Sequence, residues 1–337
     1  MSTPEVHPQT AFVYPGQGGL APGKIARVLD RFAVCREHFV FATDYASERL
    51  HINLGKIMLE GGTVVLDGET VDINDTRIAQ PATFIESTVG SIGLVELLER
   101  KPAIRSYHSM GLLAALHDRE IIDTESALEL VLERGESMHQ AFIERPGAMA
   151  AFFNVAEERL MALCKKWGIT IANENSHTEM IVSGDEEGVD SAIEEQNEEV
   201  EKNGGKKPIR LVVPGAAHSD IVKSAGAAMG RKVDAIKDRF QIPEGLPEGI
   251  AVFSSRTLRF LRSFEDVKAD VAGLPDRVYW KSTILQLADD GFTDIFETGP
   301  GSKLSRLPRK DSIMAEHLKA RGAFIMSLDQ LLDKETR

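Results

Sequence analysis

The stretch that decides the fold is a strand, a turn and a helix start, read as Pro102-Ala103-Ile104-Arg105-Ser106-Tyr107, His108-Ser109-Met110-Gly111 and Leu112-Leu113-Ala114-Ala115-Leu116. A serine in such a turn has its hydroxyl exposed above a helix N-terminus, which is the nucleophile elbow of α/β enzymes. The backbone N–H of Met110 would then point to the place where a tetrahedral oxyanion forms. The usual pattern is Gly-x-Ser-x-Gly, and Tyr107 stands at its first glycine. An N-cap role for Ser109 therefore stays open.

The residues upstream of this stretch predict a second strand and several helices. Residues 11–14 read as a strand that Pro15-Gly16-Gln17-Gly18 breaks sharply. Residues 61–75 are rich in Gly, Asp and Thr and indicate a surface loop or a small hairpin. An apolar, buried helix is expected to begin after Gln80-Pro81 and to run to about Leu98.

The residues downstream of Gly147 change in pattern. Strand-like and helical runs follow one another in the order βαββαβ, which is typical of a ferredoxin-like unit inserted in a larger α/β body. We therefore predict an α/β-hydrolase-like core made of residues 11–147 and 214–337. Residues 148–213 are predicted to form the ferredoxin-like small subdomain.

The composition and net charge of the chain limit the classes of protein to which it can belong. The 337 residues are 42% hydrophobic and 27% charged, as in a soluble globular protein, and no apolar run is long enough for a membrane span. The net charge of −13 argues against nonspecific nucleic-acid binding and against a polybasic membrane surface. Two cysteines, Cys35 and Cys164, and a polar N-terminus fit a cytoplasmic protein. No phosphate loop, dinucleotide fingerprint or metal-ligand cluster appears, so we expect neither a metal nor a cofactor.

Seven short segments stand in the order that they have in the malonyl-CoA:acyl carrier protein transacylases. This family also includes the acyltransferase domains of fatty-acid and polyketide synthases. The segments are Pro15-Gly16-Gln17-Gly18, Gln80-Pro81-Ala82, His108-Ser109-Met110-Gly111, Arg134-Gly135, Pro146-Gly147-Ala148-Met149-Ala150, Gly215-Ala216-Ala217-His218-Ser219 and Gly299-Pro300-Gly301. Each segment is short, but their common order makes the chain resemble this family from Phe12 to about Leu304.

The resemblance implies a catalytic serine–histidine dyad. Ser109 would attack a thioester, and His218 would be its base, because a free hydroxyl is a weak nucleophile. A backbone carbonyl, which alignment on the family places near Gly273, would hold the other ring nitrogen of His218. Gln17 would join the N–H of Met110 in the oxyanion site.

The resemblance also implies the substrate class. Arg134 corresponds to an arginine that binds the free carboxylate of malonate, as guanidinium geometry favours. His108 would either hydrogen-bond the substrate or brace the turn. Tyr107 and Ala217 are expected to shape the pocket. Ala217 replaces a bulky residue of the family, so that a substituted malonyl group could enter.

The function implied by the resemblance is transfer of a malonyl or substituted malonyl group from coenzyme A to the phosphopantetheine thiol of an acyl carrier protein. Two alternatives stay open. One is an acyl-thioester hydrolase. The other is a catalytically idle relative that binds a carrier protein or a synthase partner, which the departures at Tyr107 and Leu112 would favour. Carrier proteins are acidic, so the basic stretch 303–310 is the predicted docking face, ahead of the basic stretch 256–262.

Overall fold

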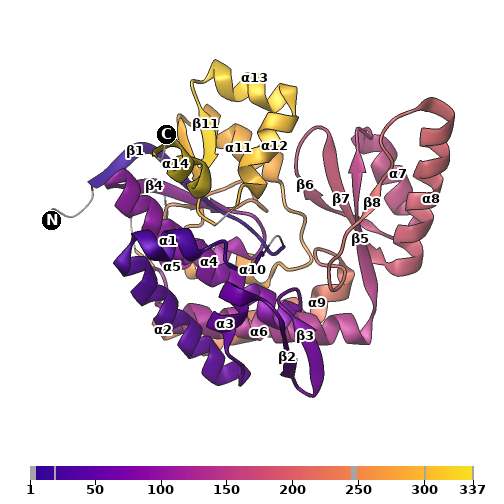
Figure 1. Ribbon diagram of the computed structural model, residues 1–337. Helices are drawn as coiled ribbons and strands as arrows, with labels where there is room; N and C mark the ends of the chain where they lie inside the picture. Colours follow the sequence, from indigo (N-terminus) through magenta and orange to yellow (C-terminus); the bar gives the residue numbers. More distant parts are fainter. Residues whose placement is uncertain (1–4, 19, 244–248, 300, 336–337) are drawn as a thin grey trace.

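The computed structural model describes residues 5–18, 20–243, 249–299 and 301–335, and its centre is a parallel sheet. Five strands run in the order β11-β10-β1-β4-β9, and every neighbouring pair is parallel. The strands are β1 (Glu5–Tyr14), β4 (Arg100–Tyr107), β9 (Val252–Phe253), β10 (Asp294–Glu297) and β11 (Phe324–Ser327). Figure 1 shows this sheet in the larger part of the molecule.

Both faces of this sheet are buried, and the alternation along β1 shows why. Phe12 and Tyr14 belong to the larger hydrophobic cluster, whereas Ala11 and Val13 belong to a second cluster on the opposite face. Sheets of parallel strands are covered on both faces in this way. The helices of the larger cluster include α4 (Thr76–Leu98), α5 (Gly111–Asp118), α6 (Thr124–Glu144), α9 (Lys223–Ala235) and α10 (Phe264–Ala272). The second face is covered by α11 (Trp280–Asp289), α12 (Lys303–Lys310) and α13 (Ser312–Ala320).

The remaining helices of the core, apart from the second 3-10 helix, also contribute buried side chains to the larger cluster. They are α1 (Ala26–Arg31), α2 (Ala33–Leu50), α3 (Leu54–Glu60), α14 (Leu328–Glu335) and the short 3-10 helices η1 (Asp220–Val222) and η2 (Lys237–Arg239). Residues 61–75 contain the hairpin of β2 (Thr63–Leu66) and β3 (Glu69–Asp72), one of the two structures predicted there. No helix of the described residues is long and apolar enough to cross a membrane.

Helix α4 begins earlier than the sequence pattern predicted. It starts at Thr76, where the side chain of Asp75 accepts a hydrogen bond from the N–H of Arg77, and Pro81 lies inside it. The prediction that the helix follows Pro81 was therefore wrong. The N-cap interaction of Asp75 secures the first turn, which offsets part of the cost of a proline in a helix interior. As a result Gln80 is held on a helix rather than on a loop.

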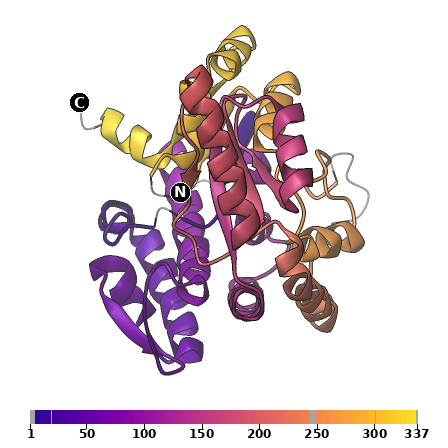
Figure 2. The same cartoon turned by 90° about the vertical axis from the view of Figure 1, so that its right-hand side faces the viewer.

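The second part of the molecule is an antiparallel sheet with two helices. Its strands, in the order β6-β7-β5-β8, are β5 (Gly147–Phe153), β6 (Thr170–Glu174), β7 (Glu179–Asp185) and β8 (Ile209–Arg210). The helices α7 (Glu157–Trp167) and α8 (Glu186–Asn203) cover its outer face, which Figure 2 turns toward the viewer. This is the βαββαβ order, so the predicted fold class of an α/β core with an inserted ferredoxin-like unit is confirmed.

The topology determines where a site can form. Because the strands of the core are parallel, the segments that follow β1, β4, β9 and β10 emerge at one edge of the sheet. The register pairs Tyr14 with Tyr107 and Ser106 with Phe253, so the first three of these strands end at nearly the same level. This edge lies on the side of the core nearest the antiparallel sheet (Figure 1).

Candidate active site

Ser109 lies on a strained turn between β4 and α5. Its backbone φ is +51°, a left-handed conformation that side chains other than glycine seldom adopt. Close packing of the turn against the end of β1 imposes this bend. The N–H of His108 donates to the carbonyl of Tyr14, and a Cβ at Gly111 would lie 2.3 Å from the same oxygen. Gly111 is therefore required for the close approach, and the serine is held at the tip of the turn.

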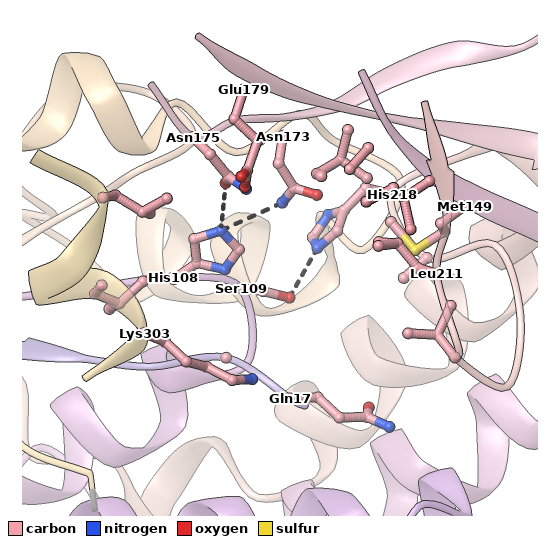
Figure 3. Close-up of a pocket in the computed structure, with 18 of the residues that line it drawn as sticks. Gln17, His108, Ser109, Met149, Asn173, Asn175, Glu179, Leu211, His218 and Lys303 are labelled. Carbon is pink, nitrogen blue, oxygen red and sulfur yellow. Dashed lines mark hydrogen bonds between the residues drawn. The ribbon is translucent and has the colours of Figure 1, made fainter. Parts of the chain in front are cut away.

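The hydroxyl of Ser109 faces the imidazole of His218 (Figure 3), and the Oγ–Nε2 distance is 2.8 Å. The Nδ1 atom of His218 lies 2.8 Å from the carbonyl oxygen of Asp276. A carbonyl only accepts hydrogen bonds, so Nδ1 carries the proton and the lone pair of Nε2 is directed at the hydroxyl. The two residues stand 109 positions apart in sequence, and the fold brings them together.

The carbonyl that holds His218 is not the one predicted. The oxygen of Gly273 instead accepts hydrogen bonds from the N–H of Asp276 and from the guanidinium of Arg256. Helix α10 ends at Ala272, and the turn from Gly273 to Asp276 brings the carbonyl of its last residue to the imidazole. The prediction of Gly273 was wrong because alignment on the family could not specify the shape of this turn.

Burial sets the charge of the imidazole. His218 is 4% exposed, and burial lowers its pKa to about 3, with the nearby Arg134 and His108 adding to the effect. The imidazole is therefore neutral at physiological pH, which is the form that can accept a proton.

Arg134 extends from α6 to the same point. It is 5% exposed, its Nη2 lies 3.4 Å from Ser109 Oγ, and its Nη1 donates to Gln80 Oε1 over 2.6 Å. No carboxylate among the described residues forms a salt bridge with this guanidinium, and burial together with Arg256 lowers its pKa to about 9. A buried cation without a counterion is costly, so the site is suited to an anionic ligand.

A short series of hydrogen bonds between polar side chains orients Arg134. The amide of Gln80 donates to Thr76 Oγ1 over 2.8 Å, which leaves its oxygen for the guanidinium. Thr76 in turn donates to Gln17 Oε1 over 3.3 Å. Gln80 belongs to one of the segments shared with the family, but no role was predicted for it. Gln80 follows Thr76 by four residues, a spacing that brings two side chains together on a helix. This spacing is informative only when both residues are known to lie on α4.

The dyad lies in a cavity of about 470 Å³ between the core and the antiparallel sheet. The wall contributed by the antiparallel sheet is mixed in polarity. Asn173 and Asn175 lie 3.4 and 3.3 Å from Nε2 of His108, whereas Met149 and Leu211 form an apolar part near His218 (Figure 3). These contacts join His108 to the antiparallel sheet, and they favour bracing of the turn, one of the two roles predicted for it. The two asparagines were missed by sequence reasoning.

Of the two predicted oxyanion groups, Met110 is next to the serine in the chain, and Gln17 is one of the residues that line the cavity. Gln17 lines the cavity from the segment after β1, and Met110 is the N-cap of α5, with its side chain buried. No acceptor within the described part of the chain takes the backbone N–H of Met110. A donor at a helix start without an internal partner is available to a ligand.

Of the two residues predicted to shape the pocket, one lines the cavity and the other does not. Ala217 lines the cavity beside His218, but Tyr107 does not. Tyr107 is fully buried and points behind the turn, where its hydroxyl donates to the carboxylate of Asp270. The prediction of Tyr107 as a pocket residue was wrong, because alternate residues of a strand face opposite ways and position 107 faces the core. Leu112 is also in the core, 3% exposed.

The comparisons with known proteins agree with this geometry. Residues 11–244 match the family model described as the acyl transferase domain. The chain is 29% identical over 311 residues to a malonyl CoA-acyl carrier protein transacylase of Bacillus subtilis (strain 168), with 89% of each chain covered.

Solved structures show the same fold. The chain superimposes on a malonyl-CoA:acyl carrier protein transacylase from Xanthomonas oryzae pv. oryzae with a TM-score of 0.79 at 24% identity, covering 96% of this chain and 95% of that one. A malonyl-transacylase in complex with its type II polyketide-synthase acyl carrier protein gives a TM-score of 0.78 at 23% identity, covering 97% and 99%. Since the family model spans more than half of the sequence, the chain belongs to the acyl transferase family, and its predicted relationship to the malonyl-CoA:acyl carrier protein transacylases is confirmed.

Proposed function

We propose that this protein transfers a malonyl or substituted malonyl group from coenzyme A to the phosphopantetheine thiol of an acyl carrier protein, through an ester on Ser109. The observation that carries the proposal is the buried guanidinium of Arg134, which has no carboxylate partner among the described residues and lies 3.4 Å from Ser109 Oγ. A free carboxylate at one end of a short acyl group would bind Arg134 while the thioester at the other end meets the serine.

In the first half-reaction, His218 Nε2 takes the proton of the Ser109 hydroxyl as Oγ attacks the thioester carbon. The carbonyl of Asp276 stabilises the imidazolium that forms. Gln17 and the N–H of Met110 bind the oxyanion of the tetrahedral intermediate, for which each donor is typically worth roughly 10²–10³ in rate. The C–S bond then breaks, and the imidazolium returns its proton to the departing thiolate of coenzyme A.

The second half-reaction runs the same steps in reverse order. The thiol of the phosphopantetheine arm gives its proton to His218 and attacks the ester carbon. The C–O bond breaks, and Ser109 recovers its proton from the imidazolium. No redox partner or metal is needed for either step, since each is an exchange of one acyl bond for another.

Mass spectrometry of the intact protein tests this function. Incubation with malonyl-CoA is expected to add one malonyl group, and holo acyl carrier protein is then expected to remove it and to gain the same mass. Release of free malonate with no need for carrier protein would instead indicate a thioester hydrolase. Absence of both adduct and turnover would indicate a relative that only binds its partners.

The pH dependence of acylation follows from the low pKa of His218. A base must be deprotonated to act, so activity is lost only as pH falls through that pKa, which burial and Arg134 lower to about 3. The rate of acyl-enzyme formation is therefore expected to be nearly the same at pH 5 as at pH 7. An imidazole of ordinary pKa would be only about 3% deprotonated at pH 5. A rate that falls by half near pH 6.5 would contradict the assignment.

The basic stretch 303–310 forms α12 at the mouth of the cavity. Lys303 turns into the cavity wall, and burial lowers its pKa to about 8. Arg306, Arg309 and Lys310 are exposed, and the first and last of them also line the cavity. An acidic carrier protein would meet these cations as its arm enters, which favours complex formation by charge complementarity.

Charge reversal tests this docking face. Changing Arg306, Arg309 and Lys310 together to glutamate is expected to raise the KM for carrier protein at least tenfold when transfer is measured from the preformed acyl-enzyme. The matched control reverses three exposed cations elsewhere, Lys56, Lys165 and Arg231. An equal change of KM in both triple variants would show a general effect of net charge rather than docking on α12.

A further inference from the structure

A buried polar network lies directly behind the serine–histidine pair. At its centre is Asp270 of α10, which is 5% exposed. Its carboxylate accepts hydrogen bonds from Tyr107 Oη, from Ser254 Oγ over 3.1 Å and from Arg256 Nε over 3.0 Å. None of these groups takes part in the chemistry described above. Burying a tyrosine hydroxyl, a carboxylate and a guanidinium together is costly unless all are satisfied, as they are here.

One end of this network reaches the strand that carries the nucleophile. Strands β4 and β9 are paired with Ser106 opposite Phe253, so Tyr107 at the end of β4 lies beside Ser254 just after β9. The two hydroxyl oxygens are 3.0 Å apart. Tyr107 is followed after one residue by Ser109, and its anchoring therefore restrains the start of the strained turn.

The other end reaches the turn that holds the base. The Nη1 of Arg256 donates to the carbonyl of Gly273, the same oxygen that accepts the N–H of Asp276. A Cβ at Gly273 would lie 2.4 Å from Arg256 Nη1 and 2.5 Å from the carboxylate of Asp276, so any larger residue there would displace these two side chains. Arg256 thus clamps the turn whose last carbonyl receives Nδ1–H of His218.

The network and the dyad are also close in space. A void of about 20 Å³ is lined both by the dyad, Ser109 and His218, and by Arg256 and Asp270. A shift of either the strand end or the turn would therefore be transmitted to the 2.8 Å contact between serine and histidine. Reaction rates fall steeply when such a contact is displaced by as little as about 1 Å.

We propose that Tyr107, Asp270 and Arg256 are positioning residues. They hold Ser109 and His218 at the hydrogen-bonding distance of 2.8 Å from each other. In a catalytic triad a carboxylate orients the histidine directly. Here the network orients His218 through the backbone carbonyl of Asp276. The network also restrains β4, the strand that precedes the nucleophile. It also explains the tyrosine at position 107, which supplies the hydroxyl that ties β4 to α10. This inference rests on the proposed function.

The test measures acyl-enzyme formation from malonyl-CoA in a single turnover, which gives a maximal rate and a half-saturating concentration. Arg256→Met is expected to lower the maximal rate roughly 10–100-fold and to leave half-saturation within about twofold, because Arg134 still binds the carboxylate. Tyr107→Phe, which removes one oxygen atom, is expected to lower the rate in the same manner by about three- to tenfold. Arg231→Met, at an exposed position of α9, is the matched control.

The outcomes separate the inference from the function on which it rests. If the unaltered protein forms no acyl-enzyme, the proposed function fails. If it does, and both variants match Arg231→Met within twofold, the positioning role is overturned. A rise in the half-saturating concentration equal to the loss of rate also overturns it, since that indicates a deformed substrate site. If thermal unfolding shows that Arg256→Met does not fold, the Tyr107→Phe rate alone decides.

Discussion

The Ser109→Ala protein is expected to form no adduct with malonyl-CoA, and its transfer rate should fall roughly 10⁴-fold or more. Ser109 Oγ is the atom that His218 contacts at 2.8 Å, and alanine offers no atom to which the acyl group could be attached. The loss should be chemical rather than structural. Alanine retains the backbone of the turn, and the contacts of Gly111 with the end of β1 do not involve the hydroxyl.

Intact mass after incubation with malonyl-CoA measures this directly, and thermal unfolding of the same samples reports the fold. Ser137→Ala is the matched control, since Ser137 lies on α6 about one turn from Arg134 and its hydroxyl donates to the carboxylate of Glu133. An adduct of unchanged yield on the Ser109→Ala protein would mean that another side chain is acylated. The assignment of the dyad would then be wrong.

Arg134→Met should change the choice of substrate rather than the chemistry. The kcat/KM for malonyl-CoA is expected to fall about 10³-fold, which corresponds to about 4 kcal/mol. The reason is that the carboxylate of the acyl group would be buried beside Gln80 and Ser109 without a cation. Acetyl-CoA carries no such charge, so its kcat/KM should stay within a few-fold or rise.

Competition between malonyl-CoA and acetyl-CoA for a limited amount of enzyme gives this ratio in one experiment. The acetyl ester is the internal control, because it uses the same serine, base and oxyanion donors. Arg134→Lys should recover only part of the malonyl rate, since an ammonium cannot form the paired hydrogen bonds of a guanidinium. A loss of the same size for both esters would show that Arg134 maintains the structure instead of recognising the carboxylate.

The pairing of a buried arginine with an uncharged histidine is the central electrostatic feature of the site. Burial lowers the pKa of His218 to about 3, with Arg134 adding to the effect, so the imidazole is uncharged near neutral pH. Under the proposed function, the same guanidinium would both bind the carboxylate of the substrate and help to keep the base uncharged.

Local sequence was sufficient for some parts of the site. The order of strand, turn and helix around Ser109 follows from short-range patterning, and the βαββαβ order of the small unit follows from alternating periods. His218 and Arg134 were identified because their segments resemble those of a family. Each of these inferences uses residues that are neighbours in the chain.

Other parts depended on contacts between distant segments. Nothing near Gly273 indicated that the carbonyl of Asp276, rather than that of Gly273, would meet His218, because the turn is shaped by Arg256 packing against Gly273. Nothing near Tyr107 indicated that its ring faces Asp270, 163 positions away. Asn173 and Asn175 approach His108 only because the small sheet folds against the core.

The sequence by itself determined the strand, turn and helix around Ser109, the βαββαβ order of the small unit and the family to which the chain belongs. Tertiary structure alone decided which backbone carbonyl holds the base, which way Tyr107 faces and which polar groups surround the dyad. The physical reason is that the two kinds of interaction act over different distances along the chain. Strand, turn and helix preferences act over a few residues, whereas hydrogen bonds between buried groups depend on the packing of segments that are far apart in the chain.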